Sequence, residues 1–421
     1  MKLQYRDVLI RLNHFFHVSL PLWLASLKPN KAAKLAPHTL IFPADPQNPI
    51  GSMGDQAIFL GLIQLLHQQG KHNISILCYR IPKQYWPEVN FIKISPTYSG
   101  SLEFAKQLAG ATQYIFTGAD VVDGKYGARF VCQALSFAQF TAQQHKPAII
   151  TGFSFNTQPR QIIINALNRL SDAVTIKVRD PYSLQRFHQF CQHPADLVAD
   201  TAFSMAKAEN ISADVKLWLQ QVNEQKRLAV GININRHAFK TEVQRLGQSA
   251  FLDQVQAQLQ SLAHTHKMAF CFIVHDYKTQ AGDVEMLTEL QQRFAANHSL
   301  LLTSHQPAEI KAVCAQLNLV ISARMHLAIA SLGAGTPVLV VDYQDKFAGL
   351  LHHFGLNEQA ILSPDGFLTP QLAQHVAQQL SQLEPTKQQI AQRLPKVMAL
   401  SAANLTSNQK PLTAAIHSYT Q

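Results

Sequence analysis

The stretch NLVISARMHLAIASLGAGTPVLVV, residues 318–341, decides the fold. Its apolar runs at 318–322 and 337–341 have the length and composition of buried strands, and a helix-length segment separates them. Strand, helix and strand in this order predict two parallel strands of a sheet whose faces are covered by helices.

The same alternation continues outward from this stretch. Nearest to it, apolar runs predict strands at 227–234, 268–274 and 299–302. Closer to the N-terminus, further strands are predicted at 39–42, 74–78, 113–117, 147–151 and 174–178, with helices such as 55–67, 128–143 and 160–170 between them. We therefore expect an α/β protein with two Rossmann-like, doubly wound lobes that face a ligand-binding cleft.

Five segments follow from this pattern. They are an amphipathic, basic N-terminal segment (1–37), an N-terminal lobe (38–205), a polar linker (206–226), a C-terminal lobe (227–365) and a helical tail (366–421). Pro21 and the scattered charges argue against a signal peptide in the first segment. Two interpretations remain for it: an interfacial helix anchored by Phe15, Phe16 and Trp23, or a helix packed across the back of the fold.

The composition excludes several classes of protein. Of the 421 residues 47% are hydrophobic and 15% charged, which rules out a mainly disordered chain. The apolar stretches are of strand length, so an integral membrane protein is not expected. Five cysteines without a CxxC pair favour a reducing, cytoplasmic compartment, and the 19 histidines show no metal-ligand spacing.

The net charge of +10 needs a separate explanation. No block of Lys and Arg with interleaved aromatic residues is present, so we expect no nucleic-acid partner. Anionic substrates, or the inner face of a bacterial membrane, would be attracted by the same charge.

Charged side chains follow the two strands of the opening stretch. Arg324 and His326 stand at the start of the helix after Ser322, where backbone N–H groups favour an anion. Lys346 opens the next helix, and Tyr343 lies between it and its strand. Because neighbouring parallel strands are about 5 Å apart, Lys346 and His326 are predicted to share a ligand. The alternative is a surface Arg, a His packed on the sheet and a solvated Lys.

The N-terminal lobe offers weaker candidates. Arg179 follows a strand and is placed to reach across the cleft, whereas Asp180 is interpreted as the cap of the next helix. Gly54 would allow close backbone approach, and Asp55 is either a helix cap or a base directed at a bound hydroxyl. Asp120 lies in a substrate loop or in a turn.

These motifs resemble the polysaccharide pyruvyl transferase family over roughly residues 40–356. The matching pieces are Gly54-Asp55-Gln-Ala-Ile58, Gly118-Ala-Asp120, Val178-Arg179-Asp180-Pro-Tyr-Ser183, Ala199-Asp200-Thr-Ala-Phe203, Val230-Gly-Ile232 and Ile321-Ser-Ala-Arg324-Met-His326 through Asp342-Tyr343 to Lys346. The resemblance implies a fold similar to that of GT-B glycosyltransferases. It also implies transfer of pyruvate from phosphoenolpyruvate to a sugar as a ketal. We expect no further cofactor and, from the spacing of the histidines, no metal.

The resemblance also assigns roles to residues. It implies that His326 donates a proton to the methylene carbon, while Arg179, Arg324 and Lys346 hold the phosphate and carboxylate. Asp55 becomes the candidate for the sugar hydroxyl, and the predicted substrate-binding residues are Arg324, Ser322, Gly54, Asp120 and Tyr343. The expected acceptor is a saccharide of cell-surface polysaccharide assembly, free or lipid-linked.

Two other functions stay open from the sequence. One is a GT-B enzyme that uses a nucleotide sugar, although no acidic pair suited to a ribose was found in the C-terminal lobe. The other is a non-catalytic paralogue that binds glycan. Ser52 and Met53 precede Gly54 where the family often has Asn, and this departure leaves the acceptor in question.

Overall fold

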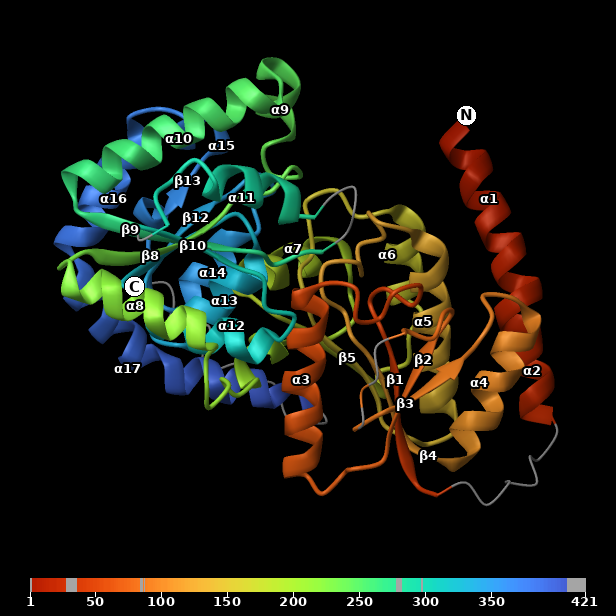
Figure 1. Cartoon of the computed structure of the whole chain (residues 1–421). Helices are drawn as coiled ribbons and strands as arrows, with labels where there is room; N and C mark the ends of the chain where they lie inside the picture. The colour runs from red at the N-terminus through yellow and green to blue at the C-terminus, as the bar shows by residue number, and fades with distance from the viewer. Residues whose placement is uncertain are drawn as a thin grey trace. The chain divides into compact units, whose positions relative to one another are not determined.

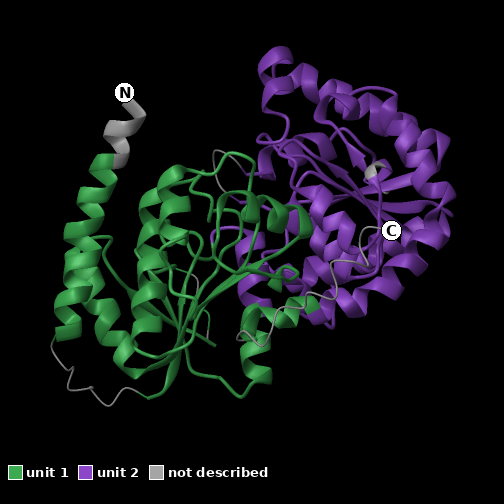
Figure 2. Ribbon diagram, turned by 180° about the vertical axis from the view of Figure 1, so that it is seen from behind, with its two compact units in different colours: residues 1–50, 62–201, 400–421 green, residues 51–61, 202–399 purple. Residues whose placement is uncertain are grey.

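The computed structural model describes residues 2–27, 36–83, 86, 88–277, 282–296 and 298–406 (Figure 1). The chain divides into two compact units, shown in Figure 2. The first unit contains residues 1–50, 62–201 and 400–421, and the second contains 51–61 and 202–399. Each unit is built on its own parallel sheet, as the strand–helix alternation predicted.

The first unit has a seven-stranded sheet in the order β3-β2-β1-β4-β5-β6-β7. Its strands are β1 (His38–Phe42), β2 (Ile74–Cys78), β3 (Asn90–Lys93), β4 (Ala111–Phe116), β5 (Ala148–Phe153), β6 (Val174–Val178) and β7 (Asp196–Leu197). All pair in parallel. The helices are α3 (Met53–Gln68), whose first half belongs to the second unit, α4 (Tyr98–Gly110), α5 (Ala128–Gln143), α6 (Gln161–Leu167) and α7 (Pro181–Phe190).

The second unit has a six-stranded parallel sheet in the order β10-β9-β8-β11-β12-β13. Its strands are β8 (Leu228–Asn233), β9 (Met268–Ile273), β10 (Ser299–Leu302), β11 (Leu319–Ser322), β12 (Val338–Val341) and β13 (Ile361–Leu362). The helices are α8 (Ala213–Glu224), α9 (Lys240–Leu246), α10 (Gln248–Thr265), α11 (Val284–Gln291), α12 (Pro307–Cys314), α13 (Met325–Gly333), α14 (Phe347–His353), α15 (Pro364–Phe367), α16 (Gln371–Ser381) and α17 (Leu383–Ala402).

The central strands are buried on both faces, which explains their continuous apolar sequences. In the first unit the rings of Phe104 and Phe137 stack at 3.8 Å between α4 and α5, and Phe42 of β1 contacts Phe137 edge-on. In the second unit Phe239, Phe251 and Phe367 form a comparable cluster. These cores fix the strands and thereby the turns at their carboxyl ends.

The segment boundaries differ from the expected ones at two places. Residues 206–226 include α8, which packs on β8 and buries Trp218, so they are part of the second unit rather than a separate linker. The predicted helical tail includes α16 and α17, and its residues 407–421 lie outside the described ones. The chain returns to the first unit at residue 400, in the last turn of α17. There Asn404 accepts a hydrogen bond from the Gly152 amide at 2.7 Å and donates one to the Ala199 carbonyl at 2.8 Å.

The N-terminal segment is helical in the first unit. Its described residues 2–27 form α1 (Lys2–His14), the π-helical turn η1 (Phe15–Ser19) and α2 (Leu20–Leu27), and residues 28–35 lie outside the described part of the chain. Contrary to the expectation from the sequence, Val8–Leu27 is long and apolar enough to span a membrane, a test that core helices and signal sequences also pass. It contacts α4 and α5, beside which it runs in Figure 1. The segment therefore packs on the fold with one face, whereas several large apolar side chains remain exposed.

Candidate functional site

The candidate site lies in the second unit, at the carboxyl ends of β8, β9, β11 and β12. The turn after β11 is shaped by Ser322, whose hydroxyl accepts from the Arg324 amide at 3.1 Å and donates to the Arg324 carbonyl at 2.8 Å. This turn makes Arg324 the N-cap of α13 and places His326 in the first helical turn. Ser322 is fully buried, so the structure gives it the role of shaping the turn.

Gly54 lies directly against the ring of His326. A Cβ atom built on Gly54 would stand 2.5 Å from His326 Nδ1 and 2.9 Å from its Cγ, which is too close for any side chain. The close approach expected at Gly54 is thus made to a histidine ring. Since Gly54 is in the first turn of α3 and His326 in the first turn of α13, two helix N-termini meet at this imidazole. Both ends carry partial positive charge, which favours a bound anion.

The guanidinium of Arg324 pairs with two acids that follow β9. Its Nε and Nη2 donate to Asp283 Oδ1 at 3.2 and 2.7 Å, and its Nη1 lies 3.2 Å from Asp276 Oδ2. Burial lowers the pKa of Arg324, but the two carboxylates outweigh it, so that the pKa rises and the guanidinium stays charged. These contacts use three of the five N–H donors of the guanidinium and indicate a positioning role for Arg324, while its contact with the substrate stays a prediction.

Asp283 is the buried centre of this network. Its Oδ2 accepts from Asn233 Nδ2 at 2.8 Å and from the His275 amide at 3.1 Å, while Arg324 occupies Oδ1. Burial raises the pKa of the Asp283 carboxyl, and these donors act against that rise. Because both oxygens accept N–H groups, the ionised carboxylate fits the site and ties the ends of β8 and β9 to Arg324.

His275 is a further histidine at the same strand ends. Its side chain is 5% exposed, and it interacts electrostatically with His326 and Arg324. Burial, together with these two neighbours, holds the pKa of His275 well below its usual value, so that its imidazole is neutral at pH 7. His275 therefore adds a hydrogen-bonding group beside His326 without adding a second charge.

Lys346 and Tyr343 follow β12, whose Val340 is in register with Ser322 of β11. Asp342 shapes this turn, because its carboxylate accepts from the amides of Gln344 at 3.0 Å and Phe347 at 3.3 Å. Lys346 is the N-cap of α14, as expected. Tyr343 interacts electrostatically with Arg324 and packs edge-on against His237, with the ring centroids 5.4 Å apart.

Asp55 takes part in the capping of α3. The Ser52 hydroxyl donates to Asp55 Oδ2 at 2.7 Å and accepts from the Asp55 amide at 3.1 Å. The Ser52 hydroxyl thus caps the amide at the third helical position, as in a capping box, and the Asp55 carboxylate holds that hydroxyl in place. Of the two roles considered for Asp55, the contacts therefore support the helix cap, and its action on a hydroxyl stays a prediction.

Arg179 and Asp120 belong to the first unit. Arg179 donates from Nε to Ser154 Oγ at 2.8 Å and from Nη1 to Asp200 Oδ2 at 2.9 Å, and its side chain is 2% exposed. Asp180 caps α7 by accepting from the Ser183 amide at 2.8 Å. Asp120 is half-buried in the turn after β4, next to Ala119, which has a positive φ of 45°. The structure thus groups seven of the nine candidates in the second unit and these two in the first.

Four residues of the site were not predicted from the sequence: His275, Asp276, Asp283 and Asn233. His275 and Asp276 stand directly after a strand that was predicted, so a search of every strand end would have found them. Asn233 closes β8 and offered the same signal. Asp283 does not follow a strand in the sequence: it is the N-cap of α11, ten residues after the end of β9, so no local pattern marked it.

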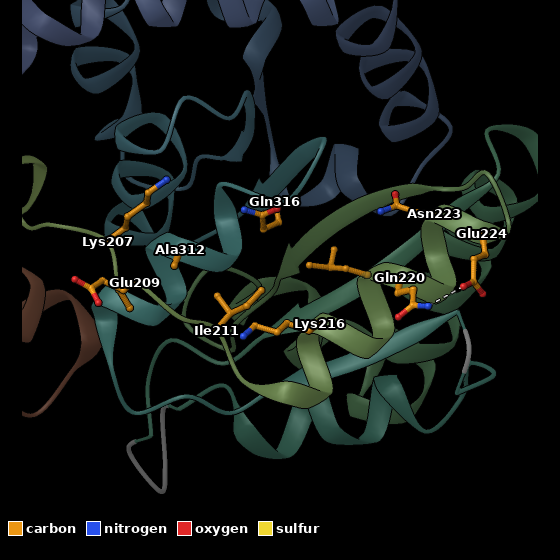
Figure 3. A pocket seen from close by; sticks show the side chains of 11 residues that line it. Lys207, Glu209, Ile211, Lys216, Gln220, Asn223, Glu224, Ala312 and Gln316 are labelled. Atoms are coloured by element: carbon orange, nitrogen blue, oxygen red, sulfur yellow. Dashed lines mark hydrogen bonds between the residues drawn. The ribbon is translucent and has the colours of Figure 1, made fainter.

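A separate pocket of about 590 Å³ lies elsewhere on the second unit (Figure 3). It is formed by the segment before α8, by α8 and by α12, with Lys207, Glu209, Lys216 and Glu224 among its lining residues. None of the candidate site residues lines it. Among the residues that the structure describes, no group of three or more His, Cys, Asp or Glu side chains is arranged to hold a metal ion.

Comparisons with known proteins agree with this architecture. The sequence profile of the family Polysaccharide pyruvyl transferase matches residues 53–345. A glycosyltransferase from Rickettsia africae is similar in structure at 10% identity, with a TM-score of 0.52 and coverage of 89% of this chain and 100% of that one. A Listeria monocytogenes protein assigned as a UDP-N-acetylglucosamine 2-epimerase matches at 10% identity and a TM-score of 0.52, over 90% and 99% of the two chains. At this identity the structural matches show the fold alone, which is GT-B-like.

Proposed function

Because this chain belongs to the polysaccharide pyruvyl transferase family, we propose that it transfers pyruvate from phosphoenolpyruvate to a saccharide as a ketal. The observation that carries the proposal is the meeting of the first turns of α3 and α13 at the ring of His326, through Gly54. An imidazole at two positive helix ends is placed to give a proton to a bound anion.

The proposed reaction begins with the protonation of the donor. His326 gives a proton to the methylene carbon of phosphoenolpyruvate, the double-bond electrons form the new C–H bond, and the adjacent carbon becomes an oxocarbenium centre. A sugar hydroxyl attacks that carbon, and its proton passes to the phosphate. The C–O bond to phosphate then breaks with both electrons leaving on the phosphate oxygen, which restores the oxocarbenium carbon. A second hydroxyl of the same sugar attacks that carbon and returns a proton to His326, which closes the ketal. The products are the ketal and inorganic phosphate.

The positive charges of the second unit would hold the donor. Lys346 and the N–H groups of the first turns of α3 and α13 supply attraction for the phosphate and the carboxylate. Arg324, braced by Asp276 and Asp283, would fix the turn that carries His326. His275 stays neutral and so adds no second positive charge beside His326.

The first unit would supply the remaining groups. The buried pair of Arg179 and Asp200 supports a role in holding the turn after β6, and direct contact of Arg179 with the donor stays a prediction. Asp120 is proposed to contact the acceptor, and Asp55 to orient an acceptor hydroxyl in addition to capping α3. We propose that the reaction takes place in the cytoplasm and that its product is used to assemble a cell-surface polysaccharide.

A nucleotide-sugar donor is the competing possibility. Asp276 and Asp283 are the acidic pair that sequence analysis did not find, but both are engaged by Arg324. Since a ribose would have to compete with a charge-assisted hydrogen-bond network, the arrangement favours a small dianion as donor.

The test is turnover with both kinds of donor. The protein is incubated with a panel of saccharides, free and lipid-linked, and with either phosphoenolpyruvate or nucleotide sugars. Phosphate release that depends on the acceptor, with a gain of one pyruvate ketal in mass, supports the proposal. Nucleotide release would replace it with glycosyl transfer, and binding of saccharide without any turnover would favour the non-catalytic paralogue.

A further inference from the structure

The face of the N-terminal helix that points away from the first unit carries large apolar side chains. The outward set comprises Val8, Leu9, Leu12, Phe15, Phe16, Trp23 and Leu27, each about half exposed. Positions 8 and 12 of α1 and positions 23 and 27 of α2 are four residues apart, so each pair lies on one side of its helix. We refer to this set as the apolar face.

The opposite side fastens the helix to the first unit. His14 Nε2 is 2.9 Å from the Ser136 hydroxyl of α5. The Tyr98 amide donates to His17 Nδ1 at 3.2 Å, and the Ser101 hydroxyl donates to the His17 carbonyl at 2.8 Å, both from α4. Val18, Pro21 and Leu22 are buried on this side. Polar contacts and these buried side chains thus hold the helix, while seven large apolar side chains remain exposed.

The charge of the segment adds a second, independent observation. Residues 2–34 contain Lys2, Arg6, Arg11, Lys28, Lys31 and Lys34 but only one acid, Asp7, so they carry half of the net charge of +10. A groove of about 370 Å³ runs between this helix, α5 and α6. Arg11 and Arg169 line it together with His14 and Phe15, and no acidic residue is among its lining residues.

We propose that the first unit docks on a bilayer that contains anionic phospholipid. The apolar face inserts at the boundary of headgroups and acyl chains, and Arg11 and Arg169 contact the lipid phosphates. Apolar residues on one side of a helix with cations beside them are the combination that interfacial helices use. Because His14 and His17 bind α5 and α4, the helix lies along the surface of the first unit and does not cross the bilayer.

Vesicle binding by the full-length protein tests this inference without any turnover assay, so its result is independent of the proposed reaction. The protein is sedimented with vesicles of phosphatidylcholine alone or with added phosphatidylglycerol. We expect at least about tenfold more protein on the anionic vesicles at low salt, with the difference lost at high salt. Equal binding to both, or binding to neither, would overturn the inference.

Two sets of variants separate the contributions. Leu12→Ser, Phe16→Ser and Trp23→Ser together should lower binding by at least about tenfold, since each removes an exposed apolar anchor. The matched control is Leu217→Ser, which changes a similarly exposed leucine on α8 of the second unit. Arg11→Gln with Arg169→Gln should reduce the preference for phosphatidylglycerol, whereas Arg245→Gln on α9 should not. Equal losses in the controls would contradict the proposed surface.

Two further measurements need no variant. Brominated lipid should quench the fluorescence of Trp23 on anionic vesicles, and alkaline extraction should release the bound protein. Retention after extraction would show a spanning helix and overturn the interfacial arrangement. Dimers that the triple variant abolishes, with no vesicle binding, would instead assign the apolar face to a second copy of the chain.

Discussion

His326 has room for its imidazole because residue 54 has no side chain. The three atoms nearest to a Cβ atom built on Gly54 all belong to the side chain of His326. The proposed acid is therefore positioned by a glycine some 270 residues away in the chain. This explains why two motifs so distant in sequence belong to one site.

Replacing His326 by Gln tests the acid. His326→Gln keeps a hydrogen-bonding side chain but removes the titratable nitrogen, so we expect turnover to fall by about 10² to 10⁴. Binding of phosphoenolpyruvate, measured by calorimetry, should change little. The control is His264→Gln, at an exposed site on α10. Normal turnover in His326→Gln would refute the assigned role.

Adding one methyl group at Gly54 tests the positioning. In Gly54→Ala the new Cβ would stand 2.5 Å from His326 Nδ1, so the ring must move. A displacement of this size should lower kcat by about 10² while the melting temperature changes by only a few degrees. Loss of kcat through unfolding would show in the melting curve. An unchanged kcat would mean that the ring position does not matter.

The residues also show how far sequence alone reaches. Arg324 and His326 could be predicted as site residues because they directly follow a predicted strand. The residues that surround them could not. Two acids bind the guanidinium of Arg324, and the contact with one of them, Asp283, spans 41 residues of the chain, which sequence spacing cannot reveal. Likewise, the burial of Arg179 against Asp200 depends on tertiary packing.

At the scale of elements, buried strands were the most predictable feature. The central strands of both sheets read as continuous apolar runs because they are covered on both faces. The missed strands lie at sheet edges: β3 is half exposed, and β7 and β13 have two residues each. Short, partly solvated strands leave little hydrophobic signal.

The N-terminal helix should respond to acid through His14. Burial lowers the pKa of His14 to about 4, so its protonated form is disfavoured when the helix is docked. His14 binds a proton more readily when the helix has detached from the first unit. The packing of the helix on the first unit should therefore weaken as the pH falls from about 6.5 towards 4. The full effect is on the order of 3 kcal/mol.

Hydrogen exchange of α1 and α5 between pH 7 and pH 4.5, corrected for the intrinsic rate, measures this docking. His14→Gln retains a partner for Ser136 but cannot titrate, and it should remove the acid sensitivity. Identical pH profiles for the two proteins would show that His14 does not govern the docking.

At the scale of the whole molecule, each of the two units is built from more than one segment of the chain. Residues 51–61 join the second unit before its main body, and residues from 400 onward return to the first. The sequence predicted two α/β units but placed their boundaries by composition. The boundaries of the units depend on long-range contacts such as that of Asn404 with Gly152, and such contacts cannot be predicted from composition.

The return of the chain should matter for the first unit. Asn404→Ala would leave the buried Gly152 amide and Ala199 carbonyl without their hydrogen bonds, at a cost of about 2 to 5 kcal/mol for the two groups. Urea unfolding followed by amide exchange should show the loss in β5 and not in the sheet of the second unit. Equal destabilisation of both sheets would contradict this division.

The central claim is that the methylene carbon of phosphoenolpyruvate receives a proton and becomes the methyl group of a ketal. The most direct measurement is turnover in heavy water with phosphoenolpyruvate and an accepted saccharide, followed by mass spectrometry and NMR of the product. We predict one deuteron in the ketal methyl group and one phosphate released for each ketal formed. A product that retains the enol double bond without deuterium, or nucleotide release in place of phosphate release, would contradict the account.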